Sequence, residues 1–310
     1  MSNSSASPAG SQAGSHWRGI VYMLVALLIL TVSDALVKLM LEKGMGLVQL
    51  LAIRGWILTA ALFLWAARGG RPGRVLATAH PWAHLVRILG GVAMTLLFFN
   101  SLKTMPLGDA TVVFFAAPFM MAALSVPILG EKVGVRRWLA IAAGFAGVVI
   151  ALQPGTDIFR LEAVLILGAS AGYAVTMLVG RRIGGRENTF RLVFYFNAGL
   201  TAVMSLLAVF TWAPLPDGVV PLLLLFCLSS VVAQLCLTRA FALAPVGVIV
   251  PFEYTGLVWA FLLGYLIWGV APGPAVLLGA GVITLSGLYI LWREHVRNSP
   301  RPVVPRRILR

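Results

Sequence analysis

Long runs of apolar residues alternate with short polar segments along almost the whole chain. An apolar run of about 20 residues is long enough to cross a bilayer as a helix. The polar segments between the runs are too short to form a separate soluble domain, so the pattern predicts an all-α membrane protein. The ten predicted spans cover residues 18–41, 46–66, 84–103, 107–129, 135–152, 161–180, 189–211, 219–241, 246–268 and 275–292.

The chain also repeats itself, with the second copy displaced by 139 positions. Met105-Pro106-Leu107-Gly108 returns as Ala244-Pro245-Val246-Gly247, and Asp34-Ala35 aligns with Tyr173-Ala174. Each copy contains five predicted spans, and an odd number of crossings turns the second copy upside down relative to the first. Inverted repeats are typical of carriers whose two halves rock about a central site. We therefore expect ten transmembrane helices arranged as two inverted five-helix repeats.

Composition and charge distribution refine this picture. With 60% hydrophobic and 11% charged residues, the chain is too apolar for a soluble domain. A formal net charge of +14 would suit a nucleic-acid partner, but Lys and Arg gather in alternate polar segments, including 68–74, 132–137, 181–191 and the stretch after Trp292. This positive-inside pattern predicts a multi-pass protein of a bacterial plasma membrane, with both termini in the cytoplasm and no nucleic-acid partner.

The same boundaries divide the chain into four parts. The first 15 residues are small, polar and uncharged, so they lack the basic start and apolar stretch of a signal peptide and predict a disordered tail. The carboxyl-terminal tail is rich in Pro and Arg; we expect a topology anchor, with contact to anionic headgroups as the alternative. The parts are a cytoplasmic tail (1–17), a first five-helix repeat (18–152), a second five-helix repeat (158–292) and a basic cytoplasmic tail (293–310).

Five ionisable residues stand out inside the predicted spans, because an ionisable group in hydrocarbon costs about 2.5–3.5 kcal/mol on insertion scales and so needs a partner or a function. Asp34 and Lys38 are four residues apart and share a helix face. They can form a structural ion pair, with Lys38 reaching the interface; alternatively, Asp34 faces a central cavity and binds substrate or a proton. Arg54 is expected to pair with a carboxylate or with backbone carbonyls, with anion binding as the alternative. Arg239, near the end of its span, is expected to extend to the interface.

Glu253 is the fifth of these residues and the strongest functional candidate. It lies roughly 10 Å into its span by helical rise, too deep for its short side chain to reach the surface. It follows Pro251, whose ring removes a backbone hydrogen bond and kinks the helix. A buried carboxyl beside an opened backbone is the chemistry of a cation or proton site. The alternative is an internal salt bridge with Arg54 or Arg239.

Other patterns indicate packing or exclude chemistry. Gly168, Gly172, Thr176 and Gly180 recur every fourth residue, which predicts close helix packing. Trp259 and Tyr173 lie deep enough to stack on a substrate ring, with core filling as the alternative. The four histidines fall in tails or in a polar loop, so we expect no metal site, no cofactor and no enzymatic activity. No nucleotide-binding motif is present, which leaves an ion or exchange gradient to drive any uphill transport.

At the level of motifs, the chain resembles the drug/metabolite transporter superfamily, and within it the ten-helix EamA-type family. The resemblance rests on the ten helices in two repeats, on the stretch from Pro118 to Lys132 and on PFEYTGLVWAFLLGYLIWG from Pro251 to Gly269. It implies a central cavity lined by helices one, three, four, six, eight and nine. On those helices it places Asp34, Asn100, Tyr173, Glu253 and Tyr254, but not Arg54, whose structural interpretation it favours.

The resulting hypothesis is a secondary active transporter of a small organic metabolite working by alternating access as a monomer or homodimer. Two acidic groups, Asp34 and Glu253, favour an amine or sulfonium substrate such as an amino acid or S-adenosylmethionine, with proton coupling or exchange both open. Asn100, Tyr173, Tyr254 and Trp259 complete the predicted substrate site. Export of lipophilic drugs or of metabolites such as riboflavin is the alternative within transport. A membrane scaffold or receptor without transport is the alternative from another class.

Overall fold

The computed structural model describes residues 9–68, 77–131, 133–153 and 161–298, and within these ranges the chain is helical and contains no strand. Within the described part of the chain, ten helical spans are long and apolar enough to cross a bilayer, as predicted. The elements of the first half are α1 (Ala9–Glu42), α2 (Leu47–Arg68), α4 (Pro81–Ser101), α5 (Leu107–Phe114), α6 (Ala117–Leu129) and α7 (Val135–Leu152). Those of the second half are α8 (Leu161–Ile183), α9 (Thr189–Thr211), α10 (Val219–Leu243), α11 (Val246–Ile249), the short 3₁₀ helix η1 (Val250–Tyr254), α12 (Thr255–Trp268) and α13 (Pro274–Asn298).

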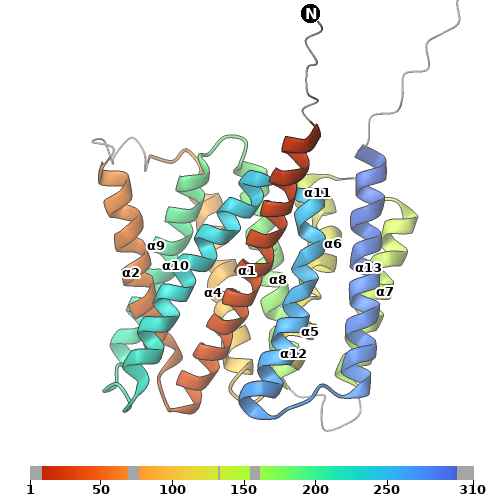
Figure 1. Ribbon diagram of the computed structural model, residues 1–310. Helices are drawn as coiled ribbons and strands as arrows, with labels where there is room; N and C mark the ends of the chain where they lie inside the picture. The colour runs from red at the N-terminus through yellow and green to blue at the C-terminus, as the bar shows by residue number, and fades with distance from the viewer. Residues whose placement is uncertain (1–8, 69–76, 132, 154–160, 299–310) are drawn as a thin grey trace, which may run out of the picture.

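The ends of the chain differ from the predicted tails. Helix α1 begins at Ala9, inside the segment 1–17 that was expected to be disordered, and α13 continues to Asn298. The remainder of both predicted tails lies outside the described residues. Both described ends of the chain lie at the same end of the helix bundle (Figure 1).

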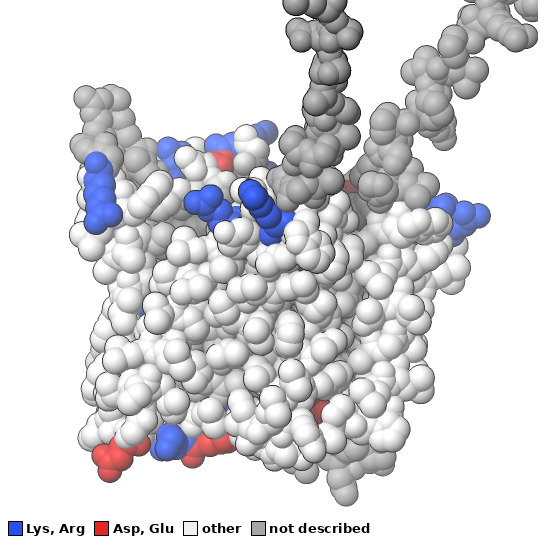
Figure 2. Space-filling view, viewed as in Figure 1, with Lys and Arg blue, Asp and Glu red and all other residues white. Residues whose placement is uncertain are grey.

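Charge is segregated along the bundle. Figure 2 shows Lys and Arg gathered at the end where α1 begins and α13 ends, which we call the basic end. A broad uncharged band separates it from the opposite end, where acidic residues are more prominent. Large apolar side chains such as Leu64, Leu206 and Phe210 are exposed on the outside of the bundle. An apolar band of this kind fits a hydrocarbon environment, so the molecule is a multi-pass membrane protein.

Helix pairs pack through small residues, as the spacing of the glycines predicted. A Cβ added to Gly172 of α8 would lie 2.6 Å from the carbonyl oxygen of Gly90 on α4, and the Thr176 hydroxyl donates to the Arg87 carbonyl at 3.1 Å. At another crossing, Gly279 of α13 lies against the backbone of Gly147 on α7. Glycine lets two backbones approach without a side chain between them.

The packing pairs are related by the offset of 139 residues. At this offset α8 is the counterpart of α1, and α10 is the counterpart of α4. Helix α1 packs on α10, and its counterpart α8 packs on α4. Likewise α7 packs on α13 and α2 packs on α9, each with its own counterpart. If a two-fold axis relates the two halves, each helix pair must recur with the counterpart helices, and these pairs agree with that requirement.

The fourth and ninth spans are both discontinuous at equivalent positions. The fourth span is interrupted at Phe115–Ala116, between α5 and α6, and the ninth is interrupted at η1, between α11 and α12. Pro251 lies in η1, where its missing N–H and its ring prevent a regular α-helix, as predicted. The rings of Phe115 and Tyr254, which are 139 positions apart, pack against each other with centroids 5.3 Å apart.

Candidate functional site

A cavity of about 220 Å³ opens beside the interruption of the ninth span, and we call it the Glu253 cavity. Five spans line it: the fourth, fifth, sixth, ninth and tenth. Its polar lining consists of Ser125, Arg137, Arg181, Glu253 and Tyr254. The first, third and eighth spans, which the family resemblance placed around a central cavity, do not line this one, whereas the fifth and tenth do.

Glu253 belongs to η1, where the interrupted backbone positions its carboxylate at the cavity. The Thr255 hydroxyl donates to the Phe252 carbonyl at 2.7 Å and so satisfies one of the acceptors that the irregular turn leaves. The half-buried Glu253 side chain makes no hydrogen bond or ion pair within the described part of the chain. In particular, neither Arg54 nor Arg239 forms a salt bridge with it.

The two predicted tyrosines, Tyr173 and Tyr254, differ in their relation to this cavity. Tyr254 follows it in η1, is buried, and directs its hydroxyl at Gly287 of α13, where any larger residue would collide with it. Tyr173 of α8 packs on Phe114, with ring centroids 5.6 Å apart. The Glu253 carboxylate interacts electrostatically with both tyrosines. Tyr254 therefore lines the same cavity as Glu253, whereas Tyr173 does not.

Asn100 and Trp259 lie elsewhere. The Asn100 amide is exposed and donates to the Leu96 carbonyl of its own helix at 2.8 Å. Trp259 lies on α12, where its buried indole N–H has no hydrogen-bond partner among the described residues. Neither side chain lines the Glu253 cavity.

The predicted pairing of Asp34 with Lys38 is replaced by other contacts. Half-buried Asp34 interacts electrostatically with Arg54 of α2. The Arg54 Nε donates to the Ser230 hydroxyl at 3.1 Å, and its guanidinium lies 5.4 Å from the centre of the Phe226 ring. Asp34 does not line the Glu253 cavity. These contacts agree with a structural role for Arg54, which was one of the two hypotheses for this residue.

Lys38 lies at the end of the bundle opposite the basic end, where it contacts two other segments of the chain. Its buried ammonium donates to the carbonyls of Leu102 at 2.6 Å and Met105 at 2.9 Å, and it lies 3.7 Å from the Glu42 carboxylate. The Trp268 indole donates to the same carboxylate at 2.9 Å. We call Lys38, Glu42 and Trp268 the clasp, because they join α1, the α4–α5 connection and α12. A second cavity of about 240 Å³ lies beside the clasp.

Arg239 is exposed near the end of α10, close to the basic end, where its side chain can extend to the membrane interface as predicted.

His84 was expected in a polar loop but lies inside α4 and is 2% exposed. Its ring packs on Tyr195 with centroids 4.5 Å apart. His84 was the first residue of the predicted span 84–103; because Pro81 starts α4 three residues earlier, His84 lies within the helix, where it is buried.

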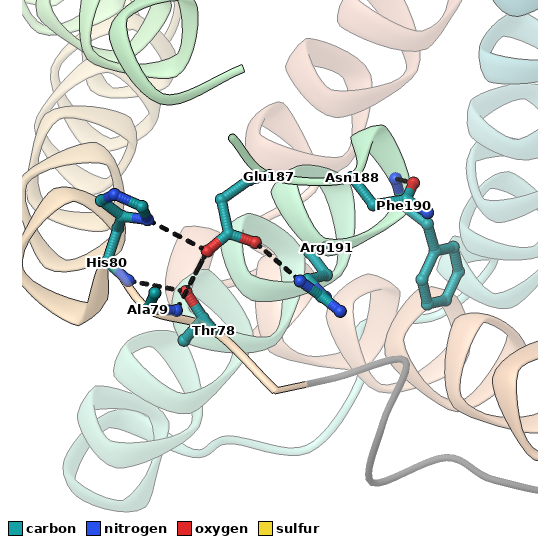
Figure 3. Close-up of polar contacts among 7 residues, drawn as sticks. All are labelled: Thr78, Ala79, His80, Glu187, Asn188, Phe190 and Arg191. Atoms are coloured by element: carbon teal, nitrogen blue, oxygen red, sulfur yellow. Dashed lines mark hydrogen bonds and ion pairs between the residues drawn. The ribbon is translucent and has the colours of Figure 1, made fainter. Parts of the chain in front are cut away.

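Sequence reasoning also missed a polar cluster at the basic end, centred on Glu187 between α8 and α9 (Figure 3). The Glu187 carboxylate accepts from the Thr78 hydroxyl at 2.6 Å, from the Ala79 N–H at 3.2 Å, and lies 3.3 Å from both His80 Nδ1 and an Arg191 nitrogen. The hydrogen bond from Thr78 is the main reason that the pKa of Glu187 falls to about 2, although burial opposes it. In the sequence, Glu187 is the one acidic residue among Arg181, Arg182, Arg186 and Arg191, and this pattern could have indicated the cluster.

This geometry can now be set beside known proteins. Residues 17–153 match the EamA-like transporter family, over nearly the same residues as the first predicted repeat. A riboflavin transporter of Rhizobium johnstonii is 31% identical over 73% of this chain and 75% of its own length. The chain belongs to the EamA-like transporter family. The predicted family is thereby confirmed, and the chain is a membrane transporter and not an enzyme.

Other relatives of this EamA-like chain cover nearly all of it. An S-adenosylmethionine uptake transporter of Rickettsia prowazekii is 27% identical over 92% of the chain and 96% of its own length. A pseudopaline exporter of Pseudomonas aeruginosa is 25% identical over 86% and 94%. A crystal structure that is 18% identical superposes with a TM-score of 0.60 over 90% of the chain and 97% of that structure, a similarity of fold alone.

Proposed function

We propose that this EamA-like transporter is a secondary carrier of small organic metabolites that bear an amine or a sulfonium, with Glu253 as the group that binds the cation. The observation that carries the proposal is a carboxylate without a hydrogen bond or ion pair among the described residues, located where a spanning helix is broken and facing a cavity. An ionised carboxylate in such a place is costly unless a cation or a proton compensates it.

Alternating access between the two ends is the proposed mechanism. The Glu253 cavity lies near the basic end, and the clasp ties three segments together at the other end. This combination supports a state in which the Glu253 cavity is reached from the basic end, while the second cavity of about 240 Å³ lies beside the clasp at the other end. The exchange of packing partners across the offset of 139 residues supports an inverted repeat, whose halves can rock to open the opposite side.

We assign the basic end to the cytoplasm of a bacterial cell, because cytoplasmic segments of membrane proteins carry an excess of Lys and Arg. The cavity then faces inward. Uptake and export both occur among the relatives, so the proposal specifies a substrate class and leaves the direction to the prevailing gradients.

A riboflavin-like substrate is the second candidate. It is favoured by the riboflavin transporter of Rhizobium johnstonii and by the paired rings of Phe115 and Tyr254 at the cavity, which offer an aromatic surface to a flavin. It is less suited to Glu253, because riboflavin brings no positive charge to an unpaired carboxylate.

Flux into proteoliposomes tests the proposal. We expect labelled S-adenosylmethionine to enter vesicles containing the wild-type protein, and Glu253→Gln to reduce the flux by about tenfold or more, because a hydrogen bond to a charged group contributes about 1.5–3 kcal/mol. Asp217→Asn, a change at an exposed acid, should leave the flux unchanged.

Two outcomes would count against the proposal. Full activity of Glu253→Gln would return this residue to a structural role, and riboflavin flux without S-adenosylmethionine flux would favour the second candidate. The same vesicles test proton coupling through Glu253: flux that ignores an imposed pH gradient at a fixed membrane potential would contradict it.

A further inference from the structure

The Glu253 cavity contains a second unpaired charge, of opposite sign. Arg137, in the first turn of α7, lines the cavity, and its Nε is completely buried without a hydrogen-bond partner among the described residues. The neighbouring Arg136 is exposed and does not line the cavity. The other arginine of the cavity, Arg181, pairs with Glu131 at 2.8 Å. Arg137 is therefore the cavity cation that no described carboxylate neutralises.

Arg137 and Glu253 do not neutralise each other. Within the described residues they form no ion pair, although the same cavity exposes both. Arg137 comes from the start of the fifth span, whereas Glu253 comes from the break in the ninth. Each group has lost part of its hydration without gaining a partner, which is unfavourable unless a ligand supplies the missing contacts.

We propose that Arg137 and Glu253 are the two poles of one site for a zwitterion, in which Arg137 binds the substrate's carboxylate and Glu253 binds its ammonium or sulfonium. This inference rests on the proposed function and adds the carboxylate, the residue that recognises it and the orientation of the substrate. The planar guanidinium fork matches a carboxylate in a two-pronged hydrogen bond. Phe115, Met177 and Tyr254 line the same cavity and supply apolar surface to the rest of the substrate.

A pair of probes that differ only in the carboxylate isolates the role of Arg137. S-adenosylmethionine carries the carboxylate, and decarboxylated S-adenosylmethionine keeps the sulfonium and the amine. In proteoliposomes, Arg137→Gln should weaken the apparent affinity for the first by about tenfold to a hundredfold, the effect of losing charged hydrogen bonds. It should change the affinity for the second less than about twofold. Arg136→Gln should change neither.

Arg137→Lys provides the second variant, because it keeps the positive charge and loses the fork. We expect it to recover part of the affinity for S-adenosylmethionine, and thermal melting of each variant verifies folding. An equal loss for both probes would overturn the proposal by making Arg137 a general structural residue, and so would no loss for either. If wild-type protein carries only the decarboxylated probe, the zwitterion site is wrong and the cation carrier stands. If it carries neither probe, the proposed function itself fails.

Discussion

Glu187 and Glu253 show how differently one chain can treat two carboxylates. Glu187 is almost inaccessible and is surrounded by donors from the segment before α4 and from α9 (Figure 3). Glu253 faces a cavity and has no such donors in the described structure. A carboxylate whose hydrogen bonds are satisfied stabilises the fold, whereas an unsatisfied one is available to a ligand.

Glu187 should make the stability of the protein sensitive to acid. Its pKa is about 2 in the folded protein, below its ordinary value of 4.5, so its stabilisation is complete above about pH 4.5 and is lost as the pH falls towards 2. Glu187→Gln should therefore lower the melting temperature in detergent at neutral pH, and the gap to wild type should narrow in acid. A difference in melting temperature that does not change with pH would show that the charge of Glu187 does not contribute to stability.

Elements were the most predictable level of this structure. The apolar runs located all ten spans because bilayer thickness fixes their length, and Pro251 predicted the break in the ninth. The break between Phe114 and Ala117 was missed, because Pro118 is compatible with the start of a helix and gave no separate signal. The starts of α1 at Ala9 and of α4 at Pro81 were also missed, because hydrophobicity indicates which residues lie in the hydrocarbon and not how far a helix continues beyond it.

Close helix packing gives a prediction about glycine. Gly172→Ala should destabilise the protein by roughly 1–3 kcal/mol, because the new methyl group would meet the Gly90 backbone between α8 and α4. Gly281→Ala, on α13 with open space around it, should be neutral or stabilising by up to about 1 kcal/mol. Thermal melting of both variants is the measurement; equal effects would mean that the α4–α8 contact is not tight.

The whole molecule joins elements that sequence alone could not bring together. Charge pattern predicted that Arg137 belongs to a basic segment, but only the fold places its side chain in the same cavity as Glu253. Lys38 was expected beside Asp34, four residues before it, yet it lies beside Glu42, four residues after it, and donates to the Leu102 and Met105 carbonyls of the α4–α5 connection. Side-chain partners depend on the packing of distant helices, which local spacing does not encode.

Removing the clasp should shift the molecule towards the state that is open opposite the basic end. Ala260 is buried beside the clasp and lines the second cavity. In a protein whose native Cys227 and Cys236 are replaced, Lys38→Met should speed the reaction of Ala260→Cys with an impermeant maleimide by about tenfold, because charged hydrogen bonds are lost from one state only. Lys43→Met, at an exposed lysine, is the control. Unchanged labelling would mean that the clasp does not hold the closed end.

The central claim, that this protein is a carrier working by alternating access, is tested most directly by counterflow. Proteoliposomes containing the wild-type protein are loaded with unlabelled S-adenosylmethionine and diluted into a trace of labelled S-adenosylmethionine. A carrier exchanges substrate through one alternating site, so the account predicts a transient accumulation of label that exceeds its outside concentration, with no such peak for Glu253→Gln. Label that merely equilibrates, or that fails to enter, would contradict the account.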